Sequence, residues 1–238
     1  MKKAIATVGA VLLAAGAANG AITQYSQDFE GLAAGSPTAL GDDGWLVGAN
    51  VFDAGGGFIY NYFAFPAPNG SGAFSNVASG EGGPAQGAQQ LVAFNDYNNT
   101  DHSNFPDRII EANLFQEMMI DASNVGQTWT FTFDYKTGDL QAPSTAAAFI
   151  KTIDPGNGFA TTNFVQTATD DSSLWNTKSL SLTIDNGLVG QLFQFGFLNT
   201  ASNFNPSGVF YDNINVTPTP ATAALLGLGG LAATRRRR

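Results

Sequence analysis

The sequence feature that most constrains the fold is a strict two-residue alternation in the segment TWTFTFDYK, residues 128–136. Every second residue is aromatic, namely Trp129, Phe131, Phe133 and Tyr135, and polar residues fill the positions between them. Successive side chains of a β-strand point to opposite faces. The segment therefore predicts a strand that has four rings in a core and its other face in water.

Weaker segments of the same kind occur along most of the chain, separated by Gly, Asn, Ser and Thr. No window of 12 or more residues keeps a helical period, except at the two ends. We therefore predict an all-β, two-sheet antiparallel sandwich. No repeat of fixed period is visible, which excludes solenoids and propellers. The further expected strands are 22–29, 45–52, 58–65, 90–95, 114–120, 147–153, 163–169, 180–184, 192–198 and 209–216.

The N-terminus has the layout of a secretory signal peptide. Lys2 and Lys3 precede an apolar run, residues 4–17, and Ala18-Asn19-Gly20 is a small-x-small tripeptide typical of a cleavage site. We predict a signal peptide over residues 1–20 that is cleaved after Gly20, with Ala18 and Gly20 as the recognised small residues. The folded part is then one domain, residues 21–216.

The C-terminus, residues 217–238, combines a breaker, a short apolar run and a basic end. Pro218 and Pro220 flank Thr219, residues 221–233 are apolar, and the chain ends in Arg235, Arg236, Arg237 and Arg238. As a helix, the apolar run would reach roughly 20 Å, short of the ~30 Å hydrocarbon core of a bilayer. With the arginine stems snorkelling, it is long enough for transient membrane insertion. An ordinary C-terminal helix is the alternative.

This order of features resembles the PEP-CTERM sorting tail of exported proteins of Gram-negative bacteria, with Thr219 where that family usually has Glu. The resemblance implies that a hydrophobic sorting helix is recognised by an exosortase-type sorting enzyme. It also implies an exported protein of the cell envelope or the extracellular space that is anchored in the membrane only transiently.

Charge and cysteine content exclude some partners. The net charge is −9, and six of the ten basic residues lie in the two terminal segments, so the central part is more acidic still. Such a body repels phosphate backbones, and we expect no nucleic-acid partner. It suits divalent cations better. Because the chain has no cysteine, an exported domain must be held by its core or by a metal rather than by disulfides.

Four places in the body carry a second resemblance, and they occur in this order: DFEG at 28–31, QGAQQL at 86–91, GQTWTF at 126–131 and VFYDNINV at 209–216. They are similar to the jelly-roll carbohydrate-binding modules and galactose-binding-like domains. The resemblance implies a jelly roll and an association with exopolysaccharide. It also implies a structural calcium ion between the first and last strands, with Glu30 and Asp212 as the matching carboxylates. The alternative is that both residues cap turns or accept backbone N–H groups.

Two aromatic stretches are candidates for ligand contact. Tyr60 and Tyr62 follow a run of three glycines, and Asn95, Asp96 and Tyr97 form a polar loop around a ring. Sugars offer C–H faces to rings and hydroxyls to amides and carboxylates. Packing in the core is the alternative for the first stretch, and plain solvent exposure is the alternative for Tyr97.

Catalysis has little support in the sequence. His102 is the only histidine, and no nucleophile elbow, zinc-protease motif or phosphate-binding loop is present. We predict a non-catalytic exported protein of the cell envelope or extracellular matrix that associates with glycan. A purely structural surface protein and a glycan-acting hydrolase with a carboxylate pair are the alternatives.

Overall fold

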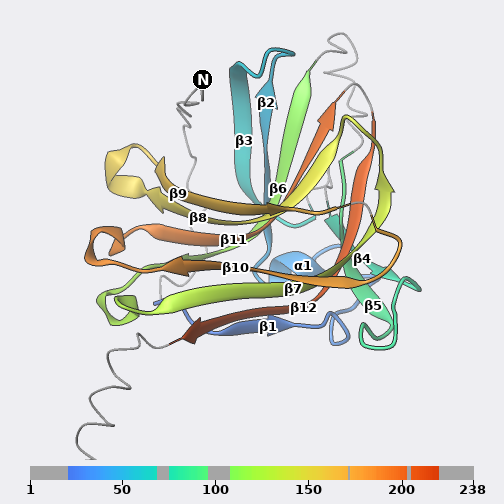
Figure 1. The fold of residues 1–238 in the computed structure, drawn as a ribbon, viewed down its shortest axis with the longest axis horizontal. Coiled ribbons are helices and arrows are strands. Elements are labelled where there is room, and N and C mark those ends of the chain that lie inside the picture. The colour runs from blue at the N-terminus through green and yellow to red at the C-terminus, as the bar shows by residue number, and fades with distance from the viewer. Residues whose placement is uncertain (1–20, 69–74, 96–107, 171, 203–204, 220–238) are drawn as a thin grey trace, which may run out of the picture.

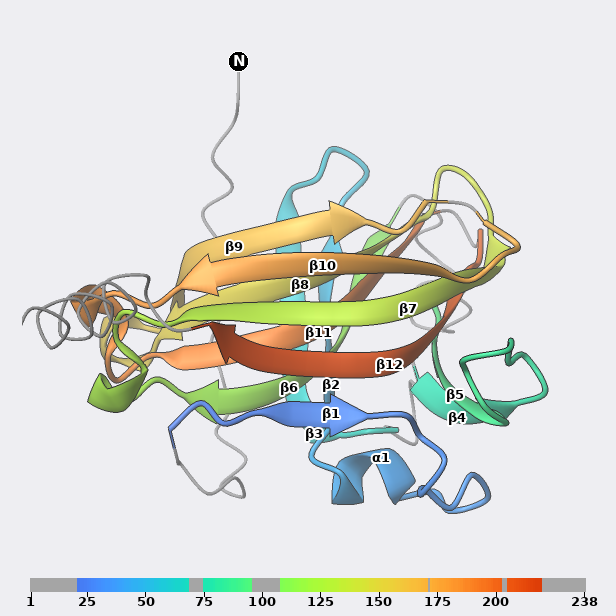
Figure 2. The ribbon, with the colours of Figure 1, turned by 60° about the horizontal axis from the view of Figure 1, so that its bottom comes forward.

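The computed structural model describes residues 21–68, 75–95, 108–170, 172–202 and 205–219. These residues form two six-stranded antiparallel sheets, shown in Figures 1 and 2. The first sheet has the order β10–β7–β12–β5–β4, with β1 also paired to β12. The second sheet has the order β3–β2–β6–β11–β8–β9. The predicted all-β sandwich of two antiparallel sheets is confirmed.

The elements have the following bounds. The first sheet contains β1 (Tyr25–Gln27), β4 (Ser75–Ser79), β5 (Gln89–Ala93), β7 (Thr128–Leu140), β10 (Asn176–Thr183) and β12 (Ser207–Thr219). The second sheet contains β2 (Leu46–Phe52), β3 (Phe58–Pro66), β6 (Ile109–Met119), β8 (Thr145–Asp154), β9 (Ala160–Ala168) and β11 (Leu192–Ser202). The short helices are α1 (Ala39–Asp42), η1 (Ala122–Asn124), η2 (Pro155–Asn157) and η3 (Asn186–Leu188).

The path of the chain is that of a jelly roll, because successive strands alternate between the two sheets. The strands β5, β7, β10 and β12 belong to the first sheet, whereas β6, β8 and β11 lie between them in sequence and belong to the second. The second sheet is strongly twisted: β2 and β3 run steeply across the direction of β8 and β9 in Figure 1.

The core between the sheets is aromatic. The four alternating rings of β7 are all buried, as predicted, and they face three buried phenylalanines of β11. The ring centroids of Phe131 and Phe195 are 5.3 Å apart. Phe197 stacks on Tyr211, with 3.5 Å between their ring centroids. Offset and edge-on contacts of this kind add stability beyond the burial of area. The four rings of residues 128–136 therefore point into the core, as their alternation in the sequence predicts.

Most strand ends differ by a few residues from the predicted ranges, and two differences are larger in consequence. Strand β4 was not predicted, because its sequence SNVAS offers only one sizeable apolar side chain, Val77, to the core. Strand β12 continues past Val216, the expected end of the domain, and its Pro218 lies opposite Trp129 of β7. The first residues of the expected sorting segment are thus part of the first sheet.

Both chain ends lie outside the described residues. The expected cleavage residues Ala18 and Gly20 are among them, and so are Pro220 and the four arginines from Arg235 to Arg238. Within the described part of the chain, no helix has the length and apolar character needed to cross a membrane.

The first sheet contains a junction that positions the candidate cation site. Strand β12 pairs with β1 up to the pair Gln27–Ile214, and with β5 from the pair Tyr211–Leu91. Its register with β7 shifts just after Asp212, where Asn213 has a positive φ of 49°. Asp212 therefore lies where β1 ends and β5 begins.

Candidate functional site

Asp212 is the most unusual carboxylate in the described part of the chain. The residue is 0% exposed. Its Oδ1 accepts the backbone N–H of Asn213 at 2.6 Å, whereas its Oδ2 is buried and accepts no hydrogen bond from the described residues. A buried charged oxygen without a partner is costly. Protonation of the carboxyl group or a neighbouring cation would relieve this cost.

Neighbouring carboxylates add to this cost. The pKa of Asp212 is raised to about 7, mainly by burial; the backbone N–H of Asn213 opposes the rise, and the negative charges of Asp134, Asp28 and Glu30 add to it. Asp134 stands directly opposite Asp212 on β7. Like charges on facing strand positions destabilise a sheet unless something neutralises them.

Asp134 itself is fully occupied by donors, so it is a neighbour of the site rather than a free ligand. Its Oδ2 accepts from Gln86 Nε2 and from Asn213 Nδ2, both at 2.8 Å. Its Oδ1 accepts from Thr177 Oγ1 at 2.5 Å. Its position on the wet face of β7 was predicted, but its proximity to Asp212 depends on strand register and could not be read from the sequence.

Glu30 anchors the other side of the junction. One carboxylate oxygen, Oε1, accepts the backbone N–H groups of Ala88 and Gln89, both at 2.7 Å. Gly87 has a positive φ of 56°, and a Cβ added there would overlap that same oxygen. Glu30, which follows β1 in the chain, thus contacts the start of β5 and links the two strands. These bonds correspond to the alternative in which Glu30 accepts backbone N–H groups, and they leave its second oxygen, Oε2, for another role.

The described side chains alone supply too few ligands for a metal ion. Calcium takes about 6 to 8 oxygen ligands, and carboxylates combine with backbone carbonyls to supply them. Asp212 Oδ2 is a buried acceptor that lacks a donor, and Glu30 lies in the electrostatic neighbourhood of that group. In the described ranges, no group of three or more His, Cys, Asp or Glu side chains is arranged to hold a metal. Backbone oxygens would therefore have to complete the shell.

A second candidate site lies on the outer face of the second sheet, turned away from the first sheet. Phe115 of β6 and Phe149 of β8 lie on either side of Gly196 of β11, and both phenylalanines are buried. The ring of Phe63 from β3 lies over Gly48 of β2, where an added Cβ would meet it at 2.8 Å. The two glycines therefore make room for a shallow aromatic layer on this face.

A row of polar side chains crosses the same face. Asn50 Nδ2 donates to Glu111 Oε1 at 3.0 Å, and Asn113 Nδ2 donates to the same oxygen at 3.1 Å. Lys151 Nζ donates to Asn113 Oδ1 at 2.7 Å and lies 4.3 Å from the ring centroid of Phe149. Strands β2, β6 and β8 are thereby connected, and we call these four polar residues the outer-face row.

Three features distinguish the outer-face row from an ordinary strand surface. Burial lowers the pKa of Lys151, and the charge of Glu111 partly offsets that effect. Asn50 Oδ1 is buried and has no hydrogen-bond partner within the described ranges. Phe164 of β9 lies next to the row, with its ring 5.1 Å from Lys151 Nζ, and it is 45% exposed. Phe164 is thus a neighbour of Lys151, whereas Asn50 lies on β2, which β6, β11 and β8 separate from β9.

The sequence did not single out this row. Glu111 and Asn113 form an alternating polar pair within an otherwise apolar strand, and Lys151 interrupts the apolar run AAAFI. Polar residues within otherwise apolar strands were the sequence feature that could have pointed to this row. Strand pairing, which a single sequence does not reveal, brings the residues together.

The ligand residues predicted from the sequence lie elsewhere. Tyr60 and Tyr62 are on β3; Tyr60 is 43% exposed, while Tyr62 packs on a small apolar cluster, and burial raises its pKa to about 12. Asn95 is buried and donates from Nδ2 to the carbonyl of Ile110 at 2.9 Å. Asp96, Tyr97 and His102 lie outside the described residues.

The carboxylates of the outer face do not form the pair that a glycosidase needs. Glu111 and Glu117 point to the same face of β6 but are six residues apart, which corresponds to about 20 Å along a strand. Glycosidases place their two carboxyl groups roughly 5 to 9.5 Å apart. Burial raises the pKa of Glu117, and a hydrogen bond from Gln194 lowers it. Glu111 and Glu117 are therefore not spaced as a glycosidase pair.

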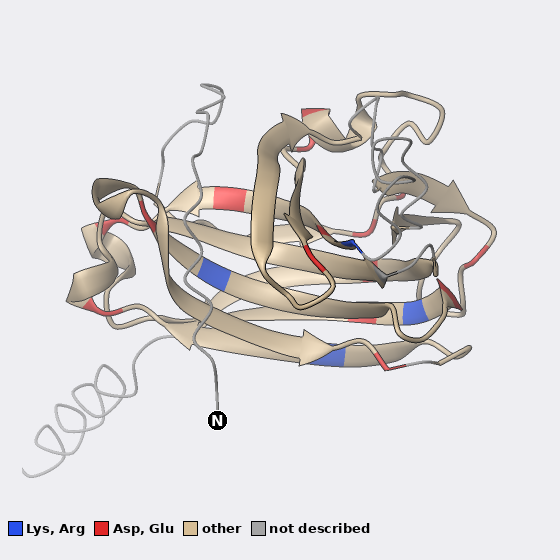
Figure 3. Ribbon diagram, turned by 90° about the horizontal axis from the view of Figure 1, so that it is seen from above, with Lys and Arg blue, Asp and Glu red and all other residues tan. Residues whose placement is uncertain are grey.

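Charge is not concentrated in any basic patch of the described strands. Figure 3 shows the described Lys and Arg positions spread over different strands, with Asp and Glu at many turns and strand ends.

Comparisons with known proteins give similarity at the level of structure. No protein-family model matches the sequence, and no curated protein matches it significantly. Similar solved structures include carbohydrate-binding modules. One is the family 11 module of a cellulosomal cellulase from Clostridium thermocellum, with a TM-score of 0.42, 13% identity, 84% of this chain covered and 98% of that one.

Proteins described as enzymes are also similar in structure. A cyclase from Fischerella sp. TAU has a TM-score of 0.47 and 14% identity, over 84% of this chain and 99% of that one. The enzymatically active domain of a tailspike protein from bacteriophage CBA120 has a TM-score of 0.47 and 13% identity, over 79% of this chain. The present chain spans only 21% of that tailspike structure.

Proposed function

We propose that this domain is a non-catalytic glycan-binding module that binds polysaccharide on the outer face of its second sheet. The observation that carries the proposal is the outer-face row, in which Asn50, Glu111, Asn113 and Lys151 form a hydrogen-bonded series beside an exposed ring, Phe164. A sheet face needs no such row for folding, since buried polar and charged groups cost stability unless they are fully paired.

The chemistry of the row matches that of a sugar. The ring of Phe164 can contact the C–H face of one pyranose, while the amides and the carboxylate, on strands farther across the sheet, exchange hydrogen bonds with hydroxyls of neighbouring sugar units.

Affinity electrophoresis through gels that contain soluble polysaccharides tests this proposal. We expect the purified protein to be retarded by at least one polysaccharide, and Phe164→Ala to lose most of the retardation. Leu174→Ala is the matched control, because Leu174 is 74% exposed and lies in the turn before β10. Normal migration in every gel, or equal retardation of wild type and Phe164→Ala, would exclude the proposed face.

We also propose that the β1–β12–β5 junction binds a structural calcium ion. Glu30 and Asp212 would hold it together with backbone oxygens, and the ion would neutralise the charge that Asp212 buries. The support is the partnerless Asp212 Oδ2 and the three neighbouring carboxylates. Such an ion would link β1 to the last strand in a protein without disulfides.

Thermal unfolding in chelator and in calcium tests the second proposal. Stability should rise by about 2.7 kcal/mol when free calcium is a hundred times its dissociation constant. Magnesium should substitute poorly, because it demands a tight octahedral shell. Asp212→Asn and Glu30→Gln should each abolish most of the gain. An unmoved wild-type midpoint would leave both residues with turn and backbone roles only.

The delivery of the domain is a third part of the proposal. We propose export through the N-terminal signal, transient membrane anchoring by the C-terminal segment and sorting by an exosortase-type enzyme. The support is the sequence of the two ends alone. Intact-mass measurement of the protein released from its host should show loss of residues 1–20 and cleavage near Pro220. A full-length mass would exclude this processing.

A further inference from the structure

Lys151 and Asn113 bring an amine and a carboxamide together on the outer face of the second sheet. Lys151 Nζ donates to Asn113 Oδ1 at 2.7 Å. Since a C=O bond is about 1.2 Å long, the amine nitrogen lies within about 4 Å of the carbonyl carbon, Cγ. Reacting atoms held about 3 to 3.5 Å apart are ready for attack. The two groups are therefore close to the arrangement in which a bond between Nζ and Cγ forms.

The strand register explains why these two side chains meet. Asn113 of β6 and Ala147 of β8 both pair with Leu198 of β11. Lys151 is four residues farther along β8 and points to the same face, because side chains of a strand alternate. Its long stem reaches back past Gly196 of β11, which has no side chain to block the path. The amine is thus held against the carboxamide by regular strands rather than by a loop.

The surroundings of the amine favour its neutral form. Lys151 Nζ lies 4.3 Å from the ring centroid of Phe149 and 5.1 Å from that of Phe164. Asn113 and Phe149 are 0% exposed. Burial lowers the pKa of Lys151, and the charge of Glu111 offsets that effect only in part. Because only an unprotonated amine has a lone pair to donate, a desolvated lysine of this kind is an activated nucleophile.

A carboxylate contacts the nitrogen that would leave. Glu111, two residues from Asn113 on the same face of β6, accepts Asn113 Nδ2 on its Oε1 at 3.1 Å. The same oxygen accepts Asn50 Nδ2 at 3.0 Å, which fixes the position of the carboxylate. A carboxylate at this place can take a proton from the attacking amine and pass it to the departing nitrogen.

We propose that Lys151 and Asn113 condense to an intramolecular isopeptide bond, with Glu111 as the catalytic residue. Lys151 Nζ attacks Asn113 Cγ, and a C–N bond forms. Glu111 takes one proton from the attacking nitrogen and gives it to Nδ2; the bond between Cγ and Nδ2 then breaks, and ammonia leaves. The carboxylate is regenerated, and the reaction needs no oxidant and no second substrate.

The bond joins β6 to β8 across β11, between residues that are 38 positions apart in the chain. Such a cross-link restricts the unfolded chain, as a disulfide does. Because the sequence has no cysteine, a bond between lysine and asparagine is a covalent link that this chain can still make. The inference is independent of glycan binding, since Phe164, Asn50 and Glu111 are unchanged by the reaction. The hydrogen bonds and the titration of the free Lys151 amine belong to chains that have not condensed.

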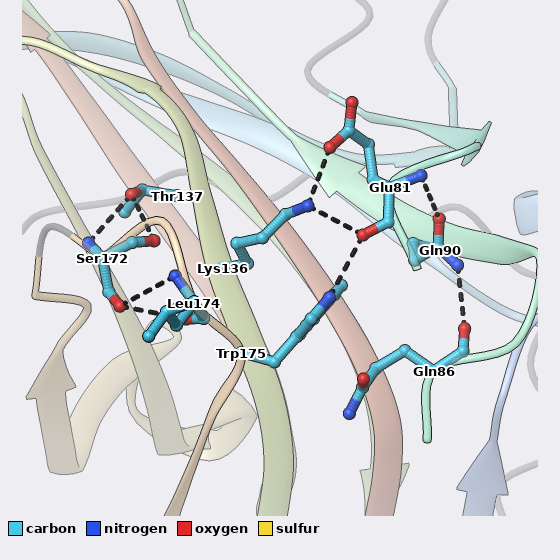
Figure 4. Close-up of polar contacts among 8 residues, drawn as sticks. All are labelled: Glu81, Gln86, Gln90, Lys136, Thr137, Ser172, Leu174 and Trp175. Carbon is cyan, nitrogen blue, oxygen red and sulfur yellow. Dashed lines mark hydrogen bonds and ion pairs between the residues drawn. The ribbon is translucent and has the colours of Figure 1, made fainter. Parts of the chain in front are cut away.

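The other two lysines of the described ranges contact carboxylates instead. Lys136 Nζ donates to the carbonyl and to the Oε2 of Glu81 in the β4–β5 loop, residues 80–88, both at 2.8 Å (Figure 4). Lys178 pairs with Asp170; although burial acts to lower the pKa of Lys178, the hydrogen bond and charge of Asp170 raise it. A carboxylate is a poor electrophile, so neither of these pairs should condense.

Mass spectrometry of the purified full-length protein tests the inference. Condensation lowers the mass by one molecule of ammonia. Trypsin should then release residues 109–136 joined to residues 137–178, because it no longer cleaves after the modified Lys151. Wild-type protein that still yields separate peptides 137–151 and 152–178, after long incubation in the folded state at neutral pH, would overturn the proposal.

Three variants separate the chemistry from the fold. Lys151→Met has no amine and should remain unlinked. Glu111→Gln keeps the size of the side chain but transfers no proton, so we expect the bond to form at least about 100-fold more slowly. Glu117→Gln is the matched control, because Glu117 shares the strand and face of Glu111 but accepts its hydrogen bond from Gln194; it should condense at the wild-type rate. Equal rates in wild type and Glu111→Gln would contradict the catalytic role of Glu111.

Thermal unfolding gives a second readout. Glu111→Gln, measured before and after prolonged incubation, compares the unlinked and the linked chain in one sequence. We expect the midpoint to rise by about 10 °C on linkage. An unchanged midpoint in chains that the peptide map shows to be linked would exclude a stabilising role for the bond. Should Glu111→Gln fail to fold, the peptide map of the wild type alone decides whether the bond forms.

Discussion

The outer faces of the two sheets are built from the same kind of strand but carry different chemistry. On the first sheet, away from its junction, hydroxyl groups of β7 and β10 pair across the strands. The hydroxyl oxygens of Thr128 and Thr183 are 2.8 Å apart, and those of Thr130 and Ser181 are 2.9 Å apart. On the second sheet, the outer-face row places a lysine, a carboxylate and two amides among phenylalanine rings. The first pattern is ordinary for a solvated β-surface, whereas the second is not.

The two patterns differ in what they cost the stability of the folded protein. Threonine has a high β propensity, and paired hydroxyls on an exposed face can be replaced at little cost. A buried lysine whose pKa is lowered by burial costs stability. This cost is what sets the outer-face row apart from the hydroxyl pairs, and the three predictions below test the contrast.

The largest effect should come from the core that both faces share. Phe131→Ala removes a fully buried ring that contacts rings from both sheets, and we expect a loss of about 3 to 5 kcal/mol in the free energy of unfolding. Thr130→Ala, one residue away on the wet face, should cost less than about 1 kcal/mol. Chemical denaturation measures both, and a Phe131→Ala loss below about 1 kcal/mol would contradict the assigned core.

Alternation made this core predictable. A period of two assigns each side chain of β7 to a face without any knowledge of its partners, so the four rings could be placed from residues 128–136 alone. Strand β4 could not be found in this way, because an edge strand that buries only Val77 and small residues has a weak apolar pattern. The pairing that makes SNVAS a strand comes from β5.

The candidate sites depended on information of a different kind. Glu30 and Asp212 were predicted from a resemblance, and the structure places both at the β1–β12–β5 junction. Asp134 and Lys136 share an alternating strand with the core rings, but their proximity to the junction depends on the register of β7 with β12 and on the path of the β4–β5 loop. Register and loop path are set by contacts between distant segments, which one sequence does not display.

A smaller effect should separate the two faces directly. Asn113→Ala removes the acceptor of Lys151 and a donor to Glu111 at a fully buried position, so we expect a loss of about 1 to 3 kcal/mol. Ser181→Ala, which removes one hydroxyl of an exposed pair on the first sheet, should cost at most about 0.5 kcal/mol. Denaturant titrations of the two variants decide the matter: similar losses would mean that the outer-face row is no more tightly coupled than the hydroxyl pairs.

The smallest effect concerns two lysines whose pKa values shift in opposite directions. Burial lowers the pKa of Lys151, with a partial offset from Glu111. Burial also acts to lower the pKa of Lys178, but the hydrogen bond and charge of Asp170, together with Tyr135, reverse the sign and raise it. Lys151 belongs to the outer-face row of the second sheet, and Lys178 lies on β10 at the edge of the first sheet.

Linkage fixes the expected signs. Lys151 binds its proton less tightly in the folded state than in the unfolded state, so its charge costs stability at neutral pH, and this cost fades as the pH rises toward the unfolded value of about 10.4. The ion pair of Lys178 stabilises below that pH, and the contribution is lost as the pH rises through its higher folded pKa. Between pH 8 and 11, the wild type should therefore gain stability relative to Lys151→Met and lose stability relative to Lys178→Met. For Lys178 the change should stay within about 1 kcal/mol, since the pair is solvent-exposed. Urea midpoints at several pH values measure both trends, and parallel curves for the two variants would show that Lys151 is as well solvated as Lys178.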